Sequence, residues 1–63
     1  MKLVYEYSNG LQLIHTKFIS NKTMLKESKN AKQVAIYACD DLDIENRIDG
    51  FFSGKYVTTL LLN

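Results

Sequence analysis

The sequence is poor in the residues that interrupt or cross-link a chain. Among its 63 residues there are three glycines, one cysteine and no proline. No linker is therefore apparent, and a hydrophobic content of 46% predicts one compact domain over residues 1–63. The lone Cys39 cannot form an internal disulfide, which excludes a disulfide-stabilised secreted mini-protein and favours the reducing cytoplasm.

Long apolar runs and a large net charge are also missing. Glu6 ends the apolar start of the chain, and no later run approaches the roughly 20 residues that cross a bilayer, so we expect neither export nor membrane insertion. The net charge is only +1, although a loose basic stretch spans Lys17 to Lys32. Residues 40–49 hold five carboxylates and one arginine, which makes this segment acidic. A protein that grips phosphates would be more basic, so nucleic acid is the less favoured partner.

Residues that could perform chemistry are few and scattered. His15 is the only histidine, and no acid or nucleophile is placed beside it by the sequence. The segment from Asp41 to Glu45 resembles the start of a calcium loop, but Asn46 and Phe52 stand where that loop needs glycine and glutamate. We therefore predict no catalytic residue, no metal site and no cofactor, and we expect a binding protein and not an enzyme.

Two strands and a tight turn are predicted at the start of the chain. Residues 2–7 and 11–19 are rich in β-branched, aromatic and leucine residues, and Asn9-Gly10 between them favours a two-residue type I′ turn. This turn predicts that Tyr5 pairs with Ile14 on the core side of the hairpin. Val4, Leu13 and His15 then lie together on the opposite, exposed side.

A long helix is predicted next. Ser28 is a plausible N-cap, Gly50 a plausible stop, and the helix would run to about Ile48 with Cys39 in its middle. Its apolar stripe, at helical spacing, would consist of Ala31, Val34, Ala35, Ala38 and Leu42. A third strand follows from Lys55 to Leu62 after a Ser53-Gly54 turn. The expected fold is α+β, a three-stranded antiparallel sheet (β-β-α-β) with one long helix packed on one face.

One set of mostly structural residues is spread over the whole chain: Met1, Leu3, Val4, Gly10, Phe18, the Thr23-Met24-Leu25-Lys26-Glu27 stretch, Tyr37, Phe52, Lys55 and Val57. In these residues the chain resembles the discriminator-of-mRNA-degradation (Dmd) family of T-even-type phage antitoxins. The first 27 positions align with the family without a gap. Two departures stand out: the family has a tryptophan where this chain has Ala31-Lys32, and an asparagine where it has Asp41.

The resemblance implies a phage protein that binds a host endoribonuclease toxin of the RnlA or LsoA type. The expected mechanism is stoichiometric: the folded domain, a monomer or weak dimer when free, occupies the RNA cleft of the toxin. Because an aromatic anchor can supply much of an interface's binding energy, the missing tryptophan bears on which toxin is recognised.

Two sets of residues are candidates for the contact with the toxin. The outer face of the predicted helix, where Ile36 stands among charges, comes first, and the exposed side of the hairpin comes second. The first set is Lys32, Ile36, Tyr37, Asp40 and Asp41, and the second is Val4, Leu13 and His15. Two alternatives stay open: a small RNA- or DNA-binding protein that uses the basic stretch, and an inhibitor of another host protein.

Overall fold

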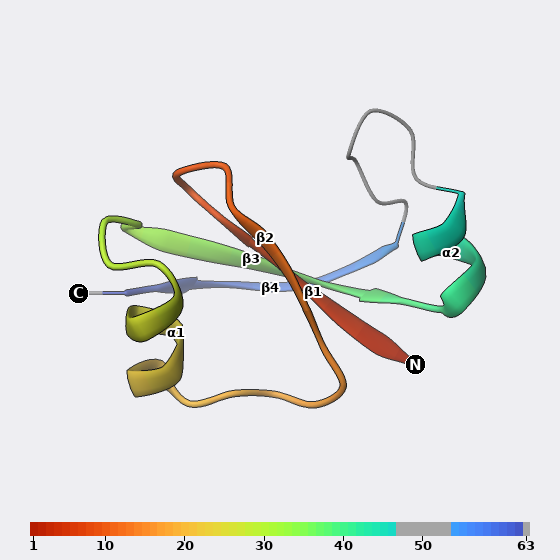
Figure 1. Ribbon diagram of the computed structural model, residues 1–63, viewed down its shortest axis with the longest axis horizontal. Coiled ribbons are helices and arrows are strands. Elements are labelled where there is room, and N and C mark those ends of the chain that lie inside the picture. Colours follow the sequence, from red (N-terminus) through yellow and green to blue (C-terminus); the bar gives the residue numbers. More distant parts are fainter. Residues whose placement is uncertain (47–53, 63) are drawn as a thin grey trace.

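A computed structural model describes residues 1–46 and 54–62, which form a four-stranded antiparallel sheet and two short helices. The strands lie in the order β2-β1-β3-β4, and the helices lie at opposite ends of the sheet (Figure 1). The elements are β1 (Lys2–Tyr7), β2 (Gln12–His15), α1 (Asn21–Glu27), β3 (Gln33–Cys39), α2 (Asp41–Glu45) and β4 (Lys55–Leu61). The chain has the expected α+β class, but the prediction of three strands and one long helix is wrong.

The predicted long helix is replaced by a strand and a short helix. Ser28, its expected N-cap, is instead the C-cap of α1, and β3 lies between β1 and β4. Val34 and Ile36 alternate on one side of β3 and are fully buried, because β-branched residues pack well on a pleated surface. The expected helix end at Ile48 and Gly50, and the turn residue Ser53, lie outside the described residues.

The hairpin forms as predicted, but with another register. Tyr7 N–H donates to the Leu11 carbonyl at 2.8 Å, so the loop has three residues, and Gly10 closes it with a φ of 94°. A three-residue loop of this kind ends on a glycine in the left-handed region. The pairing therefore shifts by one residue, and Tyr5 lies opposite Leu13 instead of Ile14.

This shift exchanges the two sides of β2, because neighbouring residues of a strand point to opposite faces. Leu13 and His15 share a face with Tyr5, whereas Ile14 shares a face with Val4. The prediction that Val4, Leu13 and His15 lie on one exposed side is therefore wrong.

Both helices begin at side-chain caps. Ser20 Oγ accepts from Thr23 N–H at 3.2 Å and starts α1, which buries Met24. Asp40 and Asp43 cap α2 reciprocally: Asp43 N–H donates to Asp40 Oδ1 at 2.8 Å, and Asp40 N–H donates to Asp43 Oδ2 at 3.1 Å. Part of the acidic segment thus has a local structural role.

The core lies on one side of the sheet, which we call the covered face because the segment from Thr16 to Lys32, including α1, crosses it. Residues from all four strands contribute to this core together with Met24 and Ala31. They are Leu3, Tyr5, Tyr7, Leu13, Val34, Ile36, Ala38, Leu60 and Leu62. The other side of the sheet is the open face.

Candidate functional site

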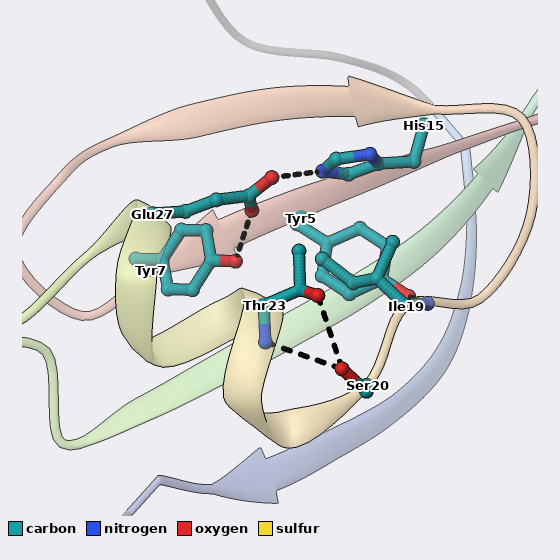
Figure 2. A network of polar contacts seen from close by, with 7 residues as sticks. All are labelled: Tyr5, Tyr7, His15, Ile19, Ser20, Thr23 and Glu27. Atoms are coloured by element: carbon teal, nitrogen blue, oxygen red, sulfur yellow. Dashed lines mark hydrogen bonds and ion pairs between the residues drawn. The ribbon is translucent and has the colours of Figure 1, made fainter.

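A polar network fastens α1 to the covered face. Tyr7 Oη donates to Glu27 Oε1 at 2.5 Å, and His15 Nε2 lies 2.7 Å from Glu27 Oε2 (Figure 2). Nearby, Ile19 N–H donates to the hydroxyl of Tyr5 at 3.1 Å. The expectation that no acid lies beside His15 is wrong, because α1 brings Glu27 to it from twelve positions along the chain.

This network has a structural role. His15 Nε2 is buried and its contact with Glu27 is close without hydrogen-bond alignment, while its ring meets the Tyr5 ring edge-on at 5.0 Å. Burial, and then the hydrogen bond to Glu27, raise the pKa of Tyr7 well above its usual range. The phenol therefore stays protonated and keeps donating to the carboxylate. Both oxygens of Glu27 are directed to the sheet, so the carboxylate acts as a clamp between α1 and the hairpin.

The centre of the open face is apolar and aromatic, and Lys2, Glu6, Gln12 and Gln33 lie around it. Val4 lies at its centre and is 1% exposed, flanked by Ile14 on β2 and by Tyr37 on β3. Tyr37 meets Tyr56 edge-on, with ring centroids 5.8 Å apart. Tyr56 is 61% exposed and Leu61, further along β4, is 74% exposed.

All five of these side chains point to the same face of the sheet. Four of them come from directly paired positions on the four adjacent strands. Val4 pairs with Ile14 and with Tyr37, and Tyr37 pairs with Tyr56, so the residues form one continuous row across the sheet. Partly exposed aromatic residues around a buried aliphatic centre are typical of protein interfaces, where tyrosine combines apolar area with a polar tip. The open face is therefore the candidate functional site.

The end of the sheet near α2 is a shallow hollow of about 610 Å³, lined in part by Met1, Asp43 and Lys55. Cys39 lies there at the end of β3, and not inside a helix as predicted. Burial raises the pKa of its thiol, and Asp43 and Asp40 raise it further, so the unreactive thiol form is favoured. Gly54 packs against this strand end, where an added Cβ would lie 2.7 Å from the Ala38 carbonyl oxygen.

The residues predicted to contact a toxin are dispersed over the molecule. Ile36 is fully buried in the core, and the interpretation of it as an exposed anchor on a helix is wrong. A charge at this position would unfold the domain, so it cannot probe binding. Lys32 is exposed before β3, Asp40 and Asp41 begin α2, Leu13 and His15 lie on the covered face, and Val4 and Tyr37 lie on the open face.

Asp41 makes an ion pair with Lys2, at 3.2 Å between Oδ1 and Nζ. Both side chains are well exposed, so the pair contributes little to stability.

The lysines of the 17–32 stretch and the tyrosine pair lie on different sides of the sheet. The lysines belong to the segment that crosses the covered face, whereas Tyr37 and Tyr56 point to the open face. A single-stranded nucleic acid needs cationic and stacking groups along one path. The separation weighs against stacking of a nucleic acid on these tyrosines, although Phe18, which is 63% exposed, lies within the basic stretch itself.

Among the described residues, no cluster of three or more histidine, cysteine, aspartate or glutamate side chains could hold a metal ion. The helices described are too short and too polar to span a membrane. Comparisons with protein-family models, with curated proteins and with solved structures find no match for this chain.

Proposed function

We propose that this protein is an antitoxin that binds a host endoribonuclease of the RnlA or LsoA type through the open face of its sheet and blocks the RNA cleft stoichiometrically. The partner class follows from the resemblance to the Dmd family. The fold supports the open face as the proposed place of contact. The observation that carries it is the row of Ile14, Val4, Tyr37 and Tyr56 across four strands.

The exposure of this row supports a role in binding. Stability alone gives no reason to leave the apolar side chains of Tyr56 and Leu61 mostly in water. The rigid sheet also fixes the side chains in advance, which lowers the entropy lost when a partner binds. Tyr37 and Tyr56 take the part of aromatic anchors in a chain that has no tryptophan.

Co-expression in bacteria tests the proposal. The wild-type chain should restore growth to cells that produce an RnlA- or LsoA-type toxin, and the toxin should co-purify with it. Tyr56→Lys should weaken binding by about 2 kcal/mol or more, roughly 30-fold in Kd, because it removes an anchor and places a charge in the contact. Rescue should fall in step.

Leu25→Lys is the matched control. Leu25 is a partly exposed apolar residue of α1, away from the open face, and lysine is a good helix former. This variant should rescue growth like the wild type, and both variants should remain folded. If the wild-type chain neither rescues growth nor co-purifies with either toxin, the proposed partner class is wrong. If Tyr56→Lys rescues fully, the open face is not the contact.

A further inference from the structure

The outer edge of β4 differs from the other sheet edge in its length. β2 forms the opposite edge with four residues, whereas β4 has seven. From Tyr56 to Leu62 the chain has no charged residue, glycine or proline. Natural sheet edges of this length are usually protected by lysine or proline, because unpaired backbone groups accept another strand.

The direction of the backbone groups on this edge follows from one hydrogen bond. Leu62 N–H donates to the Lys32 carbonyl at 3.0 Å, so Leu62 bonds towards β3. Since these groups alternate along an antiparallel strand, Thr58 and Leu60 also bond towards β3, and Thr59 and Leu61 direct their N–H and C=O groups away from it. Both residues are exposed, so none of the residues 1–46 and 54–62 covers this part of the edge.

The regular part of the edge is short and has a defined centre. The register between β3 and β4 shifts at Val57, which is the extra residue of a bulge opposite Ile36 and Tyr37. A bulge disturbs the pairing of a strand. The segment that can accept a further strand is therefore residues 58–62, with Leu60 in the middle.

We propose that this edge pairs with the same edge of a second copy of the chain, antiparallel about Leu60, so that two sheets join into one of eight strands. Thr59 of one copy then exchanges N–H···O=C bonds with Leu61 of the other, on both sides of the two-fold axis. Leu61, which is 74% exposed in the single chain, packs beside the methyl group of Thr59 across the new ladder.

The distribution of charge favours a second copy as the occupant. The only charge on β4 is Lys55 at its start, outside residues 58–62. Antiparallel pairing places the two Lys55 side chains at opposite ends of the joined strands, where they do not repel each other. A charged partner strand would find no opposite charge on this edge. A second copy of the same uncharged edge meets it without repulsion. The side chains of Thr59 and Leu61 lie on the open face, but the pairing is made by backbone groups at the edge of β4 and needs no toxin, so the inference is independent of the proposed function.

Sedimentation equilibrium of the purified chain over the micromolar range tests the inference. The average mass of the wild type should rise with concentration from one chain towards two. Thr59→Pro removes an N–H group that points outwards and leaves the bonds to β3 in place, so its dimerisation should be at least tenfold weaker. Thr59→Ala is the matched control, since it loses the side-chain hydroxyl and methyl group but keeps the N–H, and its dimerisation should stay within about threefold of the wild type.

Variants with opposite charges at positions 59 and 61 distinguish pairing at the edge from other contacts. This test remains valid even if Thr59→Pro fails to fold. The double variant Thr59→Lys/Leu61→Lys and the double variant Thr59→Glu/Leu61→Glu should each stay single chains, because like charges face each other across the ladder. Mixed in equal amounts they should form a heterodimer. A wild type that stays one chain at all concentrations, a folded Thr59→Pro variant that dimerises normally, or a mixture that does not associate would overturn the inference.

Discussion

The two faces of the sheet are built from the same strands, yet one is buried in the core and the other is largely exposed. On the covered face Leu3, Tyr5 and Tyr7 of β1 are almost completely buried, and the polar tips of both tyrosines are hydrogen-bonded. On the open face only Val4 of the same strand is buried, and its neighbour Ile14 is 39% exposed. The open face is the more polar of the two, because Lys2, Glu6 and Gln33 also point to it. The path of residues 16–32 follows the same division, since it supplies Met24 and Glu27 to the covered side only.

The covered face should therefore determine stability, and the largest effect is expected at its centre. Ile36→Ala should lower the free energy of unfolding by about 2–5 kcal/mol, because it leaves a cavity among fully buried residues. Urea denaturation followed by circular dichroism measures the loss. Leu61→Ala, an aliphatic truncation on the open face, should change stability by no more than about 0.5 kcal/mol. Equal losses for the two variants would remove the distinction between the faces.

The clamp between α1 and the hairpin should have the next largest effect. Glu27→Ala leaves the buried hydroxyl of Tyr7 without its acceptor, which should cost about 1–3 kcal/mol. Glu27→Gln keeps an acceptor oxygen and the size of the side chain, so it should lose less. The comparison of the two variants by thermal denaturation tests whether the contact is structural. A Glu27→Ala protein as stable as the wild type would show that α1 is held by Met24 alone.

The same clamp makes stability depend on alkaline pH. The pKa of Tyr7 is higher in the folded chain than its usual value of 10.0, because burial and Glu27 disfavour the phenolate. The folded state thus holds the proton more tightly than the unfolded state, and this contribution is complete below pH 10 and lost as the pH rises above it. The melting temperature of the wild type should fall above that pH, and Tyr7→Phe should fall less steeply. Tyr56→Phe, which changes an exposed phenol, should keep the wild-type slope.

The smallest effect on stability is expected on the open face, where the effect on binding should be largest. Tyr56→Ser removes a side chain that is 61% exposed and loses its edge-on contact with Tyr37, so the free energy of unfolding should fall by only about 1 kcal/mol. Affinity for the toxin, measured by calorimetry, should nevertheless fall at least tenfold. A Tyr56→Ser variant that unfolds easily would mean that the open face belongs to the core.

Part of this division could be predicted from the sequence. The alternation around Tyr5 predicts the hairpin, and the uncharged stretch after Lys55 predicts the last strand, both of which are confirmed. The register could not be predicted, because Asn9-Gly10 fits both a two-residue turn and a three-residue loop that ends on Gly10. The one additional loop residue decides whether His15 or Ile14 faces the core.

The prediction of a long helix is wrong at β3 for a related reason. Ala31, Val34, Ala35 and Ala38 have helical spacing, but Val34, Ile36 and Ala38 also alternate, and the two periods cannot be separated in so short a stretch. Ile36, which does not fit the polar face of a helix, was the available sign of a strand. The pair of His15 and Glu27 left no sign in the sequence, because α1 and the hairpin meet only in the folded chain.

Chemical-shift mapping on the isotopically labelled chain tests the division of the two faces most directly. On addition of the toxin, the signals of Ile14, Tyr37, Tyr56 and Leu61 should change strongly, while those of Met24, Leu25 and His15 should stay in place. This pattern would mean that one face holds the fold together and the other binds. Strong changes on α1 with an unchanged open face would contradict the account, because the covered face would then be the one that meets the partner.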